Sequence, residues 1–281
     1  MKITFVNPSV GTTFGGSESL IHNMANSLSF NNQVTVLTGK SSHIRFRDEI
    51  KESDYRVSTI PFSPRFTPLN NILSRIFPRL DPYKTESLTF HFNARMSQQA
   101  RKIISNSDVI SMHYRLDSRL FSNFAKKLKT ASVFHILGTL YGPAFFEKDC
   151  STLYVATTNY EAKILKKQGA DIYSVISPGV PYVLNDGSNP DFSSRNGLLF
   201  VARMQKTKGI DELLSIMSEI KGQTLTVIGT GPDLGYFKQK AKTMGVENKI
   251  RFLGALPPER VYEHMKISKI LIFPSHSETF G

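Results

Sequence analysis

Two cationic side chains, Arg203 and Lys208, stand in the stretch VARMQKTKG (201–209), between an apolar run and an amphipathic segment. A guanidinium can bind two oxygens of a phosphate group, and an ammonium can bind a third. The helix expected from residue 209 would add free N–H groups beside them. Ligands of open α/β sheets bind outside the carboxyl ends of the strands, where this stretch would lie. The pair therefore predicts a diphosphate clamp, with a solvated basic loop as the alternative.

A glycine-rich stretch, GTTFGGSESL (11–20), follows the first apolar run of the chain. Glycines there, such as Gly15 and Gly16, let the backbone approach a ligand, and the next helix offers N–H groups to an anion. The three glycines lie four and one residues apart, which differs from G-x-G-x-x-G and argues against a dinucleotide site. Taken alone, the stretch favours a helix capped by Ser17 or Ser19.

The stretch VIGTGPD (227–233) has the same order of apolar run, glycines and expected helix. Gly229 and Gly231 could admit a nucleotide, or they could only form a tight turn. Pro232 suits the start of a helix.

Two histidines, His113 and His135, end apolar runs in the first half of the chain. Either imidazole could lie at the carboxyl edge of a sheet and hydrogen-bond a sugar hydroxyl. For His113 we favour a core or edge histidine whose polar atoms are satisfied by the backbone.

These side chains need a framework of strands and helices, and apolar runs alternate with amphipathic segments along the chain. In the first half, strands are expected at 3–6, 34–38, 55–62, 108–113, 131–137, 153–158 and 173–177, with a helix at 17–30. In the second half, strands are expected at 198–203, 225–229, 250–254 and 270–274, with helices near 209–220, 234–244 and 258–268. The pattern predicts an α/β fold with parallel sheets.

The alternation predicts two domains, residues 1–184 and 198–281. Between them, residues 185–197 are polar and aperiodic and predict a linker. Residues 63–102 carry four prolines and an excess of basic residues. This insertion could lie on a membrane or line a binding cleft, but we favour an irregular segment packed on its own domain, because prolines interrupt helices.

The composition limits the compartment and the partners. The net charge is +12 with a pI of about 9.7, which suits phosphates or an anionic membrane face as well as an ordinary basic protein. Charge alone does not support nucleic-acid binding, because no recognised module accompanies it. The single cysteine, Cys150, fits a reducing compartment. Because the first apolar run is too short for a signal peptide, we expect a cytoplasmic protein, in which peripheral membrane contact stays open.

Taken together and in order, these motifs resemble the retaining GT-B-fold glycosyltransferases of family 4. The resemblance rests on the GG-S-E loop, the histidine at 135, ISPGV (176–180), FVARMQKTKGID (200–211), VIGTGPD and the final PSHSETFG (274–281). It implies two Rossmann-like domains facing a cleft, with the donor mainly on the second domain and the acceptor mainly on the first.

The resemblance also implies a role for each matching residue. Arg203 and Lys208 would hold the donor diphosphate, Gly15 and Gly16 would approach it, and His135 would lie near the transferred sugar. Glu278 would bind the donor sugar. The remaining donor-binding positions would be Gly229, Gly231, Phe280 and Gly281. No metal or other cofactor is expected, because no Asp-x-Asp motif occurs and the two cations would replace a metal.

The expected function is transfer of a sugar, with retention, from a nucleotide-diphosphate donor to a glycan or lipid-linked acceptor. One departure concerns the family's E-x7-E pattern. Glu278 matches its first glutamate, and the second would fall at 286, whereas the sequence has 281 residues. The resemblance therefore implies an incomplete second domain and a truncated chain. Two alternatives stay open: a non-catalytic remnant that binds nucleotide at most, and a nucleotide-sugar epimerase on the same fold.

Overall fold

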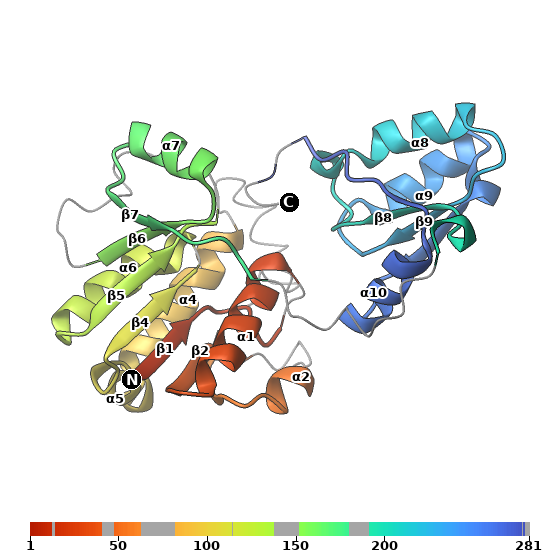
Figure 1. Ribbon diagram of the computed structural model, residues 1–281. Helices are drawn as coiled ribbons and strands as arrows, with labels where there is room; N and C mark the ends of the chain where they lie inside the picture. Colours follow the sequence, from red (N-terminus) through yellow and green to blue (C-terminus); the bar gives the residue numbers. More distant parts are fainter. Residues whose placement is uncertain are drawn as a thin grey trace. The chain divides into compact units, whose positions relative to one another are not determined.

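The computed structural model describes residues 1–12, 15–40, 48–62, 82–113, 115–137, 152–179, 191–276 and 278. The chain divides into two compact units, residues 1–180 and 181–278, whose helices and strands are labelled in Figure 1. The boundaries expected from the sequence, with a linker over 185–197, stay a prediction.

The N-terminal unit is built on a parallel sheet of seven described strands in the order β3-β2-β1-β4-β5-β6-β7. The strands are β1 Lys2–Val6, β2 Gln33–Lys40, β3 Arg56–Pro61, β4 Val109–Met112, β5 Ala131–His135, β6 Thr152–Ala156 and β7 Ile172–Val175. The order reverses between β1 and β4, which is the topological switch point of a doubly wound sheet. The sequence prediction of these strands is confirmed.

Helices cover both faces of this sheet (Figure 1). They are α1 Gly16–Ser29, α2 Asp48–Lys51, α4 Pro82–Met96, α5 Gln98–Ser105, α6 Arg115–Lys127 and α7 Asn159–Lys167. Successive strand residues point to opposite faces. Phe5 and Val36 accordingly belong to the core that includes Ile21 of α1, whereas Val6 and Leu37 belong to the core formed with α4, α5 and α6.

Helix α4 corrects part of the expectation for residues 63–102. The segment was expected to be irregular, yet its described part forms the 15-residue helix α4 followed by α5. The prolines do not prevent α4, because the last of them stands at its first position, where proline is well tolerated. Packing on its own unit is confirmed for α4, since Phe90 and Ala94 are fully buried. Residues 63–81 lie outside the described part.

The C-terminal unit contains a parallel sheet whose described strands follow the order β10-β9-β8-β11. The elements are β8 Leu198–Val201, α8 Ile210–Glu219, β9 Leu225–Ile228, α9 Leu234–Thr243, β10 Ile250–Gly254, α10 Pro258–Ile267 and β11 Ile270–Leu271. Their positions agree with the sequence prediction within a few residues. This sheet also reverses its order, between β8 and β11, so each unit has its own switch point.

Candidate functional site

The loop after β8 carries both cations of the predicted clamp. Lys208 ends the 3₁₀ turn η3 (Lys206–Lys208), and Arg203 lies two residues beyond the end of β8. Both side chains are half-buried. The Nζ of Lys208 donates to Oε1 of Glu278 at 2.5 Å. Because Glu278 follows β11, this ion pair links the segments that follow the two strands flanking the switch point, and it brings together two predicted site residues.

The segment after β11 is held against the loop after β8 at two further points. The backbone N–H of His276 donates to the carbonyl oxygen of Thr207 at 3.0 Å. Gly209 has a φ of +74°, and a Cβ added to it would lie 2.0 Å from the carbonyl oxygen of Pro274. Only glycine fits this approach, so the packing of the two loops fixes the backbone that carries Lys208 and Glu278.

The glycines after β9 serve a similar close approach. Gly229 has a φ of +133°, and its added Cβ would lie 1.9 Å from the carbonyl oxygen of Ala202. An added Cβ at Gly231 would lie 2.4 Å from the carbonyl oxygen of Met204. Packing against the β8 loop thus accounts for both glycines, and their expected contact with the donor stays a prediction.

Asp233, which the sequence pattern does not single out as a site residue, connects the same two loops. Its Oδ2 accepts from the backbone N–H of Lys206 at 3.0 Å, and its own N–H donates to the Met204 carbonyl at 3.1 Å. The acidic residue just before a helix was a usable signal. Pro232 lies two residues before α9, in a turn, so its expected place at the helix start is wrong.

In the N-terminal unit, Gly15 takes the N-cap position of α1 and Gly16 is its first residue. The expected capping by Ser17 or Ser19 is wrong, because both lie inside the helix and no side chain caps it. Instead, Ser17 Oγ donates to Oε2 of the buried Glu18 at 2.8 Å. An added Cβ at Gly15 would lie 2.3 Å from that oxygen, so this glycine leaves room for the carboxylate.

His113 and His135 lie at the carboxyl ends of β4 and β5, and their rings stack. The centroids are 4.7 Å apart and the planes differ by 12°. Burial lowers the pKa of His135 to about 4. Burial, followed by the neighbouring His135, lowers the pKa of His113 well below its usual value. The expected burial of His113 is confirmed, but its Nε2 lies 3.0 Å from Ser111 Oγ rather than from a backbone group.

The predicted site residues divide between the two units. His135, Gly15 and Gly16 belong to the N-terminal unit, whereas Arg203, Lys208, Gly229, Gly231 and Glu278 belong to the C-terminal unit. Phe280 and Gly281 lie outside the described residues. The roles assigned to all of them stay predictions.

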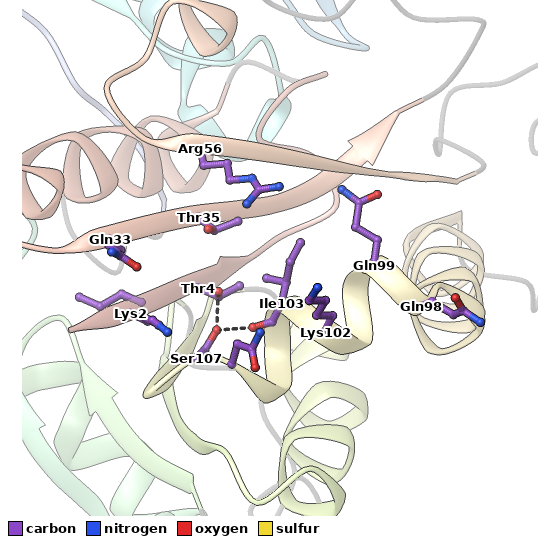
Figure 2. A pocket seen from close by; sticks show the side chains of 12 residues that line it. Lys2, Thr4, Gln33, Thr35, Arg56, Gln98, Gln99, Lys102, Ile103 and Ser107 are labelled. Atoms are coloured by element: carbon purple, nitrogen blue, oxygen red, sulfur yellow. Dashed lines mark hydrogen bonds between the residues drawn. The ribbon is translucent and has the colours of Figure 1, made fainter.

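A cavity of about 630 Å³ lies elsewhere, at the amino-terminal edge of the N-terminal sheet (Figure 2). Its lining comes from the starts of β1, β2 and β3 and from α5, with exposed cations at Lys2, Arg56 and Lys102. Thr4 and Ser107, whose hydroxyl oxygens are 2.7 Å apart, close part of it. Because ligands of parallel sheets bind at the carboxyl edge, this polar concavity is not our candidate site.

Comparison with known proteins gives a family match for the C-terminal part of the chain. Residues 185–281 match the family model of glycosyl transferases group 1. The D-inositol 3-phosphate glycosyltransferase of Nocardia farcinica is 24% identical over 254 residues, which cover 76% of this chain and 56% of that protein. The enzyme of that name from Acidothermus cellulolyticus is 30% identical over 132 residues, 40% of this chain and 30% of that protein. The matches thus span about half, or less, of these relatives.

Solved structures show the same fold at low sequence identity. Anabaena HepE in complex with UDP-glucose aligns with a TM-score of 0.74 and 17% identity, covering 100% of this chain and 76% of that one. Sucrose-phosphate synthase from Thermosynechococcus elongatus aligns with a TM-score of 0.70 and 13% identity, covering 99% and 76%. The chain therefore has the Rossmann-like α/β fold of the GT-B glycosyltransferases, and its residues 185–281 match glycosyl transferases group 1.

Proposed function

We propose that the chain transfers a sugar from a nucleoside-diphosphate sugar to a glycan or lipid-linked acceptor, with retention at the anomeric carbon. The observation that carries this proposal is the Lys208–Glu278 ion pair at the switch point of the C-terminal sheet, inside the region that matches glycosyl transferases group 1. The structural likeness to HepE, whose structures contain UDP, UDP with glucose, and UDP-glucose, supports the choice of donor class.

The proposed chemistry begins with the bond between the anomeric carbon and the diphosphate. As that bond breaks, negative charge grows on the β-phosphate oxygen, and preorganised cations stabilise it. Arg203 and Lys208 take this role. When the diphosphate binds, it replaces Glu278 as the partner of Lys208, and the released carboxylate accepts hydrogen bonds from hydroxyls of the donor sugar.

Retention follows if the acceptor attacks the face from which the diphosphate leaves. The departing phosphate oxygen then takes the acceptor's proton, so the reaction needs no separate general base. His135 contributes a neutral imidazole that hydrogen-bonds a sugar hydroxyl. Two fixed cations beside the diphosphate do the charge neutralisation that a metal ion would otherwise perform.

The experiment that tests this proposal incubates the purified chain with UDP-, GDP- and ADP-sugars, with and without glycan acceptors. Proton NMR follows the anomeric signals, and calorimetry measures nucleotide binding. The proposal predicts a transferred sugar whose anomeric configuration matches the donor. Binding without turnover would identify a nucleotide-binding remnant. Donor conversion in the absence of acceptor would identify an epimerase.

For the acceptor we propose an anionic or lipid-phosphate-linked molecule at the inner face of a membrane. The basic surplus of the chain supports this choice. None of the helices in the described ranges is long and apolar enough to span a bilayer. The basic surplus predicts an electrostatic contact with the membrane: binding to anionic liposomes at low salt should be lost as salt rises. Absence of binding at low salt would contradict it.

A further inference from the structure

The stacked histidines lie in a polar row that crosses the switch point of the N-terminal sheet. Val6 of β1 pairs with Met112 of β4, and Met112 pairs with Phe134 of β5. One residue further along each strand stand Asn7, His113 and His135. In a parallel sheet, residues that stand opposite one another on neighbouring strands point their side chains to the same face. The three polar side chains therefore follow one another across β1, β4 and β5.

The imidazole of His113 is packed between two other rings. The Phe5 ring lies 5.7 Å from it at an interplanar angle of 24°, and the His135 ring lies 4.7 Å from it at 12°. Since β4 lies between β1 and β5, these neighbours flank His113 on opposite sides. Phe5 is 1% exposed and His113 is 3% exposed. The stack therefore has a buried base at Phe5 and a half-buried outer ring at His135.

Hydrogen bonding restricts the rotation of the His113 ring. Its Nε2 lies 3.0 Å from Ser111 Oγ, two residues earlier in β4. Two buried atoms of the row, Nδ1 of His113 and Nδ2 of Asn7, have no hydrogen-bond partner among the described residues. Uncompensated buried polar atoms are costly and rare. Phenylalanine would fill the core position of His113 without that cost, so packing alone does not account for a histidine there.

The surroundings of the outer ring, His135, differ from those of His113. In the described part of the chain, the His135 imidazole makes its ring contact with His113 and no hydrogen bond. A flat ring needs a fixed plane if its nitrogen is to meet a ligand hydroxyl at hydrogen-bonding distance and angle. The rigid ring beneath it supplies such a plane.

We propose that His113 is a positioning residue for His135, which it holds by stacking so that the outer imidazole presents a nitrogen to the transferred sugar. This inference rests on the proposed function. His113 itself does not touch the sugar. Burial lowers the pKa of both histidines, and His135 lowers that of His113 further, which agrees with a pair of neutral rings.

The test compares substitutions at His113 that separate ring shape from burial. His113→Phe keeps a planar ring in the stack, His113→Leu keeps the apolar volume without a plane, and His113→Ala removes both. His91→Ala is the matched control: it also removes a buried histidine ring, which lies on α4 and contacts Phe121 and Phe124 of α6. His113→Leu keeps the proposal testable if His113→Ala does not fold.

The first measurement does not depend on catalysis. Imidazole NMR of His135 in the ligand-free protein should show one ordered ring in the wild type, His113→Phe and His91→Ala. His113→Leu should broaden the signals, because the outer ring then lacks a fixed plane to stack on. The second measurement is transfer: kcat should fall about 10- to 100-fold in His113→Leu, with most of the loss restored in His113→Phe.

The outcomes separate this inference from the proposed function. An unchanged His135 signature in His113→Leu would overturn the positioning role, whatever the activity. An equal loss of kcat in His113→Phe and His113→Leu would also overturn it, since the planar ring would then be irrelevant. If the wild type transfers no sugar, the proposed function fails while the NMR comparison still decides whether His113 orders His135.

Discussion

Lys208 and Glu278 lie seventy residues apart in the sequence, yet the lysine ammonium and the glutamate carboxylate lie 2.5 Å apart. Each is about a quarter exposed, so water screens the pair only partly. The pair holds a cation and a carboxylate side by side at the carboxyl edge of the sheet. Under the proposed function, the bound diphosphate replaces the carboxylate as the lysine's partner.

Substitution of Lys208 by alanine should weaken nucleotide binding and slow transfer together. A cation that stabilises the departing diphosphate contributes about 2–4 kcal/mol at the transition state, so kcat/KM should fall roughly 30-fold to 10³-fold. Lys206→Ala is the matched control, because Lys206 belongs to the same 3₁₀ turn but its ammonium lies over the Tyr236 ring at 4.5 Å. Equal kcat/KM values for the two variants would exclude the assigned role of Lys208.

Replacement of Gly209 by alanine should destabilise the C-terminal unit more than the same change at Gly222. Both glycines have a φ near +70°, a conformation that costs an alanine about 1–2 kcal/mol. At Gly209 the new Cβ would also meet the Pro274 carbonyl, whereas nothing lies within 4 Å of it at Gly222. Overpacking adds about 1–3 kcal/mol. Urea denaturation of the two variants measures the difference; similar midpoints would show that the two loops are not packed as described.

The sequence predicts the strands well because buried parallel strands are continuous apolar runs, and each run here matches a strand of the sheets. The errors of the sequence-based prediction are local. Ser17 and Ser19 are expected as caps because serine favours that position, but α1 begins earlier, at Gly16, and Glu18 is buried within its first turn. Proline content suggested an irregular segment where α4 lies, because the position of the last proline in the first turn could not be read from composition.

The site is only partly predictable for a different reason. Arg203 and Lys208 stand in one recognisable motif, but the contact of Lys208 with Glu278 depends on the strand order that places β11 beside β8. The stacking of His113 on His135 likewise needs β4 to pair with β5 in one register. Neither relationship is encoded in local spacing, so the sequence alone treats His113 as an ordinary core residue.

Acid should destabilise the N-terminal unit through its buried histidines. The pKa of His91 and that of His135 are lowered from 6.5 to about 4, mainly by burial, and burial also lowers the pKa of His113 well below its usual value. Below pH 6.5 the unfolded chain binds protons that the folded unit excludes. The free energy of unfolding is therefore highest above pH 6.5. As the pH drops toward 4 it falls by about 1.4 kcal/mol per pH unit for each such proton.

Hydrogen exchange of the β4 and β5 amides between pH 7 and pH 4.5 measures this effect. After correction for the intrinsic exchange rate, the free energy of unfolding of His113→Phe should fall less steeply with pH than that of the wild type. The difference in slope should be about 1.4 kcal/mol per pH unit, the contribution of one proton. Identical slopes would mean that His113 takes up its proton in the folded state.

Removal of divalent metal should leave transfer intact. Because Arg203 and Lys208 are assigned the neutralisation of the leaving diphosphate, initial rates in excess EDTA should equal those in buffer with Mg²⁺ or Mn²⁺. Loss of activity in EDTA that returns when a metal is added would show that the two cations are not sufficient.

The most direct test of the central claim is a crystal structure of this chain with a bound nucleoside diphosphate. The account predicts that the β-phosphate lies within hydrogen-bonding distance of the Arg203 guanidinium and the Lys208 ammonium, and that Lys208 has left Glu278. A diphosphate bound elsewhere on the chain, with the Lys208–Glu278 ion pair unchanged, would contradict it.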